Sequence, residues 1–144
     1  MGQTESIKLE DQLCFPLYAC AREIVKTYRP VLDALGLTYT QYIAMLVLWE
    51  DHEVSVKDLG YRLHLDSGTL TPLLKKLEEK GFLSRERSTR DERVVIASIT
   101  VEGRQLQEKA AEVPLKMAGC IDISPDEGRL LQQLLYKIME SEKD

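Results

Sequence analysis

The sequence predicts a mostly α-helical α+β fold with one small β-hairpin. Two observations carry this prediction. Apolar residues recur at helical spacing along most of the 144-residue chain, and two short runs rich in β-branched residues follow each other at 82–88 and 93–99. Because 44% of the residues are hydrophobic and 30% are charged, we expect a single domain, residues 1–144, with a modest core.

The first predicted helix is long. Apolar residues at helical period run through 13–28 and resume over 31–35, and Gly36 then supplies a natural C-terminal stop. Pro30 lies within this element and removes a backbone donor. We therefore expect Pro30 to kink or interrupt the helix.

Two capping signals predict the next two helices. Thr38, with Gln41 three residues later, is a capping box that opens an apolar helix through Trp49. Ser55 and Asp58, also three residues apart, form a similar capping signal that begins a short helix.

A fourth helix is predicted from residue 66 or 67 to Gly81, directly before the hairpin. Its leucines recur at i, i+3, i+4 and i+7, which gives the helix one apolar face. We expect these leucines to pack in the core. The polar turn 89–92 joins the two strands of the hairpin.

Two helices are predicted after the hairpin. Thr100 is expected to cap a helix that continues through Met117. The last helix spans 124–142, because a serine, a proline and a glutamate follow one another in the order typical of a helix start.

This order predicts a winged helix-turn-helix, in which two short helices and a hairpin form a DNA-binding region over residues 38–100. Residues 9–36 and 101–142 then form a second, helical region. The last helix carries a wide apolar stripe for a helix at a chain end. We therefore expect it to pack against the first helix of a second copy, as the dimerisation region of a homodimer.

The distribution of charge supports double-stranded DNA as the partner. The net charge is −5, but eight Arg and Lys against six Asp and Glu lie between Arg62 and Arg93, which leaves −7 for the rest of the chain. An acidic body can bind DNA through one basic segment.

The candidate DNA-contacting residues lie on the fourth helix and on the hairpin. Hydroxyl and ammonium groups suit phosphate oxygens and base edges, a glycine lets the backbone approach closely, and arginine suits a narrow minor groove. The helix contributes Ser67, Gly68, Thr69, Thr71 and Lys75, and the hairpin contributes Arg85, Arg87, Arg90, Asp91 and Arg93. Asp91 is expected to hold the guanidinium of Arg93 extended.

The remaining composition excludes several classes of protein. No run approaches the length of a membrane-spanning helix, and the N-terminal residues lack a signal pattern, so we expect a cytoplasmic protein without a membrane partner. Three scattered cysteines, Cys14, Cys20 and Cys120, do not suit a disulfide framework, and with two histidines they match no zinc spacing. We predict neither a metal site nor a cofactor.

Cys14 is the candidate reactive residue. Pro16 suggests that the first helix begins near it, which would expose the sulfur to the positive end of the helix dipole and favour the thiolate. Hydroxyls of Tyr18 or Tyr28, from the same subunit or across a dimer, are expected to donate hydrogen bonds to it. The alternative interpretation of Cys14 is a small buried hydrophobic residue without a chemical role. For Cys20 we prefer this interpretation.

The segment "LDSGTLTPLLKKLE", the wing "RDER" and the exit "SITVEG" resemble the MarR family of winged-helix regulators. With "LCFPLY" near the N-terminus, the chain is similar to the organic hydroperoxide resistance branch over about residues 9–119. The resemblance implies a homodimeric repressor that leaves operator DNA when an organic hydroperoxide oxidises its cysteine. It implies Cys14 as that cysteine, Tyr18 and Tyr28 as its hydrogen-bonding tyrosines, and Asp91 with Arg93 as the wing-tip pair.

Several alternatives remain open in the sequence. Cys120 lies where two-cysteine members of this branch carry a resolving cysteine, and a low-molecular-weight thiol completes the oxidation where that residue is out of reach. A MarR-type repressor released by a small aromatic ligand is the alternative to redox sensing. A thiol peroxidase is a third hypothesis. The basic segment favours DNA binding over peroxidase turnover, so we do not expect an enzyme.

Overall fold

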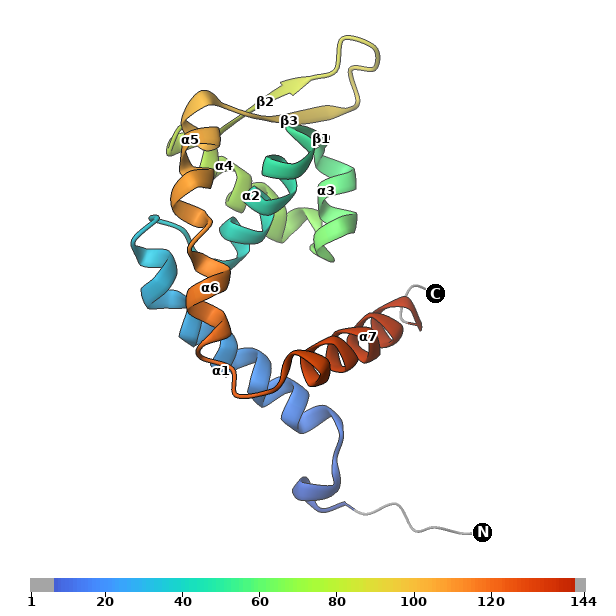
Figure 1. The fold of residues 1–144 in the computed structure, drawn as a ribbon. Helices are drawn as coiled ribbons and strands as arrows, with labels where there is room; N and C mark the ends of the chain where they lie inside the picture. Colours follow the sequence, from blue (N-terminus) through green and yellow to red (C-terminus); the bar gives the residue numbers. More distant parts are fainter. Residues whose placement is uncertain (1–6, 142–144) are drawn as a thin grey trace.

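The computed structural model describes residues 7–141 and shows a helical chain with one small sheet (Figure 1). A 3-10 turn, η1, precedes the helices at Leu9–Asp11. The helices are α1 (Cys14–Asp33), α2 (Tyr39–Asp51), α3 (Val56–Leu63), α4 (Ser67–Glu79), α5 (Val101–Ala110), α6 (Val113–Ala118) and α7 (Pro125–Ser141). The strands are β1 (Glu53–Ser55), β2 (Leu83–Arg87) and β3 (Val95–Ile99). The mostly helical fold with a hairpin is therefore confirmed.

The predicted capping residues do begin their helices. At α2, Thr38 accepts a hydrogen bond from the Gln41 backbone and the Gln41 side chain accepts one from the Thr38 backbone, which completes the capping box. Ser55 accepts from the Asp58 backbone at 3.1 Å to open α3. These bonds satisfy backbone donors that a helix leaves free at its start.

The later helix starts follow the same logic. Thr100 accepts from the Gly103 backbone at 3.0 Å at the start of α5. Before α7, Ser124 and Glu127 exchange hydrogen bonds between side chain and backbone at 3.1 and 2.9 Å. The predicted end of this helix at residue 142 lies outside the described residues.

The sheet has the strand order β1-β3-β2, with both pairs antiparallel. Strands β2 and β3 form the predicted hairpin, with Leu83 opposite Ile99 and Arg87 opposite Val95. Strand β1 was not predicted. It pairs with the other edge of β3, where Val54 lies opposite Ala97, and its last residue also caps α3.

One prediction about the helices was wrong. The single helix expected from Thr100 through Met117 is divided into α5 and α6. Pro114 explains the break, because its ring would clash with the carbonyl of Ala110, the last residue of α5. Pro30 does not interrupt α1, which continues to Asp33. Its missing N–H costs the hydrogen bond to the Lys26 carbonyl, and the helix ends three residues later.

The core lies in the upper, winged-helix part of Figure 1, where α2, α4 and the sheet meet. Its fully buried side chains include Met45, Leu48, Leu59, Leu74 and Leu77. The leucines of α4 thus pack inward as predicted. Buried Trp49 donates a hydrogen bond to the Gly103 carbonyl at 2.8 Å and so ties α2 to α5.

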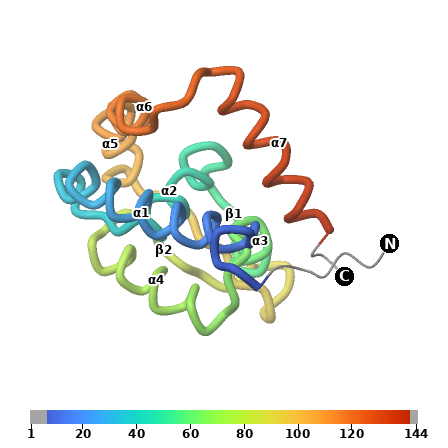
Figure 2. Tube along the Cα trace, turned by 90° about the horizontal axis from the view of Figure 1, so that it is seen from below, coloured from blue at the N-terminus to red at the C-terminus, as the bar shows by residue number. Residues whose placement is uncertain are grey.

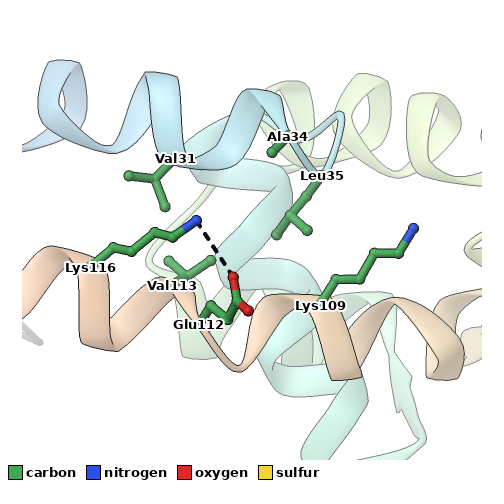
Figure 3. A pocket seen from close by; sticks show the side chains of 7 residues that line it. All are labelled: Val31, Ala34, Leu35, Lys109, Glu112, Val113 and Lys116. Atoms are coloured by element: carbon green, nitrogen blue, oxygen red, sulfur yellow. Dashed lines mark ion pairs between the residues drawn. The ribbon is translucent and has the colours of Figure 1, made fainter.

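Helix α6 connects this core to α1. Val113 of α6 and Val31 of α1 face the same small space, with the Lys116–Glu112 ion pair beside it at 3.5 Å (Figure 3). Helix α7 then leaves the body of the molecule, as Figures 1 and 2 both show, and none of its residues is buried. Within residues 7–141, every helix is too short or too polar to cross a membrane.

Candidate functional site

Cys14 is the first residue of α1, as the position of Pro16 predicted. Its thiol is exposed and free. Leu13 precedes the helix without a side-chain cap, and the first turn carries no acidic residue. Cys14 therefore lies at the positive end of the α1 dipole.

Tyr18 and Arg22 continue the row of side chains that begins at Cys14. Residues four apart lie on one face of a helix, so these three form a stripe along the first two turns of α1. A guanidinium N–H of Arg22 donates to the Tyr18 hydroxyl at 3.2 Å, and the Arg22 guanidinium carbon lies 5.5 Å from the centre of the Tyr18 ring. Sequence analysis missed Arg22, although its spacing from Tyr18 was the signal that identifies it.

Tyr28 lies at the other end of α1 from Cys14. The two residues are separated by about 21 Å of helix, at 1.5 Å per residue, so the sulfur and the hydroxyl of one chain do not meet. Of the two options that the sequence left open for Tyr28, only a contact across a dimer fits this geometry.

Tyr28 packs against two tyrosines of α2. Its ring centroid lies 4.8 Å from that of Tyr39 and 5.9 Å from that of Tyr42. Burial raises the pKa of Tyr28, with a smaller contribution from its two neighbours, and burial also raises the pKa of Tyr39. Both phenols thus keep their protons and remain hydrogen-bond donors. Tyr39 was missed by sequence analysis, because only the packing of α1 on α2 brings it beside Tyr28.

The other two cysteines are also free and exposed in the chain. The expectation that Cys20 is a buried hydrophobic residue was therefore wrong, because the middle of α1 lies outside the core. Cys120 lies between α6 and α7, and its thiol donates to the Lys116 carbonyl at 3.3 Å.

The polar residues predicted on α4 all lie on its exposed face. Ser67, Gly68, Thr69, Thr71 and Lys75 are exposed, whereas the leucines of the same helix are buried. Asp66 caps the helix by accepting from the Thr69 backbone at 2.8 Å, and these hydrogen bonds lower the pKa of Asp66. The first turn of α4 is thereby fixed with its hydroxyl groups directed away from the core.

The tip of the wing, residues 88–94, is held by the predicted contact between Asp91 and Arg93. Two guanidinium N–H groups of Arg93 donate to the two carboxylate oxygens of Asp91 at 3.1 and 3.2 Å, and the Arg93 backbone donates to one of them at 3.0 Å. These bonds lower the pKa of Asp91. The Arg93 side chain is 90% exposed, so the pair presents a positioned guanidinium to the surroundings.

The other three wing arginines differ in their surroundings. Arg87 donates to the Glu92 carbonyl at 2.7 Å and Arg90 remains exposed in the loop. Arg85 points back to the protein and pairs with Glu78 of α4 at 3.3 Å. Arg87, Arg90 and Arg93 are thus exposed on the wing, while Arg85 joins the wing to α4.

No group of three His, Cys, Asp or Glu side chains suited to a metal ion occurs within the described part of the chain.

Comparison with known proteins agrees with this arrangement. The model of the family "Transcriptional regulator SarA/Rot" matches residues 26–110. The organic hydroperoxide resistance transcriptional regulator of Bacillus subtilis (strain 168) is 47% identical over 137 residues, which cover 95% of this chain and 93% of that protein. The chain belongs to the organic hydroperoxide resistance branch of the MarR family.

Solved structures of AbfR, a protein of Staphylococcus epidermidis, resemble this MarR-family chain. Reduced AbfR bound to DNA is 35% identical, with a TM-score of 0.78 over 92% of this chain and 93% of that chain. Disulfide-formed AbfR is 37% identical, with a TM-score of 0.66 over 91% and 92%. The family and the winged-helix fold predicted from the sequence motifs are thereby confirmed.

Proposed function

We propose that this chain is a peroxide-sensing transcriptional repressor. In this proposal a reduced homodimer binds double-stranded operator DNA, and oxidation of Cys14 by an organic hydroperoxide releases it. The observation that carries the proposal is the exposed Cys14 at the start of α1, aligned with Tyr18 and Arg22 and free of acidic neighbours in the first turn. The name of the Bacillus subtilis relative and the redox states named for AbfR support it.

The proposed reaction is a two-electron oxidation of the sulfur. The Cys14 thiolate attacks one peroxide oxygen, the O–O bond breaks, and the departing alkoxide takes a proton to leave as an alcohol. A sulfenic acid remains, which condenses with a second thiol and releases water. Arg22 and the Tyr18 hydroxyl are expected to stabilise the negative charge that moves onto the leaving oxygen.

The surroundings of Cys14 suit an alkyl peroxide. Leu13 and Phe15 flank the cysteine and are 71% and 42% exposed. Apolar side chains beside the cysteine favour a substrate with a hydrocarbon group over hydrogen peroxide, because contact with that group removes apolar surface from water.

The homodimer is supported by the apolar surface of α1 and α7. Helix α7 exposes Leu130, Leu131, Leu134 and Ile138, and α1 exposes Ile24 and Val25. Monomeric proteins rarely leave a stripe of this size in water. Pairing two copies through these helices would also offer a second subunit's Tyr28 to Cys14, which its own chain cannot do.

The DNA contact is proposed for α4 and the wing. In a winged helix-turn-helix, the second helix enters the major groove, which is about 12 Å wide, and the wing follows the backbone or the minor groove. The exposed hydroxyls of α4 and the Asp91–Arg93 pair have the chemistry for these two tasks.

The test compares Cys14→Ser with wild type and with Cys20→Ser as the matched control. A duplex selected by the reduced wild-type protein from a random library serves as operator, and fluorescence anisotropy follows its release by cumene hydroperoxide. Wild type and Cys20→Ser should release the duplex, whereas Cys14→Ser should bind it and stay bound, because a hydroxyl is a far weaker nucleophile. Release of Cys14→Ser at the same dose would show that Cys14 is not the sensor. Release by salicylate instead of peroxide would favour a ligand-controlled repressor.

A further inference from the structure

A groove on the winged-helix part places a histidine beside the expected DNA contacts. The groove has a volume of about 1170 Å³ and lies between α3, the first turns of α4 and the hairpin. Ser67, Thr71 and Arg93 line it together with Lys57 of α3 and His64, the residue that caps the end of α3. Neither Lys57 nor His64 was among the predicted DNA-contacting residues.

The backbone of His64 fixes where its side chain leaves the protein. His64 ends α3 in the left-handed conformation, with φ 55° and ψ 40°, and the next residue, Leu65, donates to the Gly60 carbonyl at 3.0 Å. Glycine or asparagine fits such a helix end with less strain. His64 is thereby held at the border of the groove.

The charge of the groove is close to balance without the histidine. The charged side chains that line it are Lys57 and Asp58 of α3, Asp66 at the start of α4, Arg85 of β2 and Arg93 of the wing. With three cations and two carboxylates, the net charge of the groove lining is +1. A protonated His64 would raise this net charge to +2. The uncharged polar side chains that face the same space are Ser55, Tyr61, Ser67 and Thr71, and Met139 comes from α7.

We propose that His64 and Lys57 bind backbone phosphates of the operator, and that protonation of His64 tightens this binding. The inference rests on the proposed function and extends its DNA contact to α3. The first helix of a helix-turn-helix commonly crosses the DNA backbone. Histidine changes charge between about pH 5 and 8, and its imidazolium forms a charge-assisted hydrogen bond to a phosphate oxygen. The operator affinity of this protein thus increases as the pH falls through that range.

The experiment measures operator affinity at pH 6 and pH 8 in the presence of a thiol reductant, over a series of salt concentrations. His64→Asn removes the charge and keeps a residue that tolerates the left-handed backbone. At pH 6 it should weaken binding about threefold per half-site, hence about tenfold for a dimer. It should also flatten the plot of log affinity against log salt by about one unit per half-site. The difference between wild type and His64→Asn should shrink at pH 8, because histidines in general lose their charge between about pH 5 and 8.

Two further variants make the result specific. Lys57→Gln should flatten the salt plot at both pH values, because the lysine stays charged. His52→Asn is the matched control, since His52 also has a positive φ, 67°, at a helix end but does not line the groove. Equal affinities of wild type and His64→Asn at pH 6, or an equal loss in His52→Asn, would overturn the inference. A failure of the reduced wild type to bind any duplex at either pH would overturn the proposed function as well.

Discussion

Arg93 and Arg85 show how much the role of a single wing residue depends on its neighbours. Sequence analysis assigned both arginines to DNA, since both lie in one basic hairpin. The structure keeps Arg93 at the exposed tip on Asp91, whereas Arg85 pairs with Glu78 and its buried Nε has no partner among the described residues. The Asp91 contact was predictable, because its partner is two residues away. The Glu78 contact was not, because it requires the packing of α4 on β2.

Replacing Arg93 tests whether the wing tip contacts DNA. Arg93→Ala should weaken operator binding and flatten the salt dependence by about one unit per half-site, because one phosphate-facing charge is lost. The fold should be unaffected, since the side chain is 90% exposed. Salt titrations followed by fluorescence anisotropy measure the effect, and Arg104→Ala on the exposed face of α5 is the control. An unchanged slope and affinity would remove the wing tip from the DNA contact.

The Asp91–Arg93 pair is expected to persist at neutral pH. Hydrogen bonds from Arg93 lower the pKa of Asp91, so the carboxylate is ionised well below pH 7. Any contribution of this pair is therefore present above the ordinary pKa of an aspartate and is lost only as the pH falls through the lowered value.

At the level of elements, local signals located the helices and missed what depends on distant partners. The starts of α2, α3, α5 and α7 were predictable, because each is set by a side chain within three residues of the backbone it caps. Strand β1 has three residues, too few for a periodic pattern, and it exists because β3 offers an edge. The break between α5 and α6 was missed although Pro114 signals it, since the apolar spacing continues across the proline.

Gly103 controls how closely α5 approaches the hairpin. A β-carbon at this position would overlap the Phe82 carbonyl oxygen and would lie 2.8 Å from a side-chain carbon of Ile99. The carbonyl of Gly103 also accepts the hydrogen bond from Trp49. Gly103→Ala must therefore displace α5 from β2 and β3, and we expect it to lower the free energy of unfolding by about 2 kcal/mol or more.

Urea unfolding followed by the fluorescence of Trp49 measures this change, because the indole reports on the same contact. Gly119→Ala is the control, since its β-carbon would meet its nearest neighbour, the Lys116 carbonyl oxygen, at an ordinary 3.7 Å and its φ of −76° suits alanine. The midpoint of urea unfolding of this control should be equal to or slightly above that of wild type. Equal stability of Gly103→Ala and wild type would mean that α5 has room to move.

At the scale of the whole molecule, one chain forms a complete core only around the winged helix. The buried side chains belong to the end of α1, to α2–α6 and to the sheet, whereas the first four turns of α1 and all of α7 contribute none. The sequence indicated this division through the wide apolar stripe of the last helix. From that stripe the sequence predicted that the last helix packs against a second copy, and the exposed apolar side chains of α7 are compatible with this prediction.

The positions of the two outer cysteines predict how oxidation links the subunits. Cys120 lies one turn beyond Lys116, which borders the same small pocket as Val31 (Figure 3). Val31 and Cys14 are separated by about 25 Å of helix α1. A disulfide requires Cα atoms within about 7 Å, so Cys14 and Cys120 of one chain are poorly placed to pair. We therefore expect any Cys14–Cys120 disulfide to join two subunits, with a shift of α1 and α7 that respaces the two wings.

Wild type treated with one equivalent of cumene hydroperoxide should accordingly run as a covalent dimer on a non-reducing gel. Cys120→Ser and Cys14→Ser should both remain monomeric on that gel, and Cys20→Ser should behave as wild type. Half-sites lie about 34 Å apart, one turn of DNA, so a small change at the interface moves both recognition helices out of register and the covalent dimer should lose its operator. Intact mass separates this outcome from its alternative. An oxidised monomer that carries the added mass of a small thiol would exclude Cys120 as the resolving residue, and operator release would then follow from the mixed disulfide at Cys14 alone.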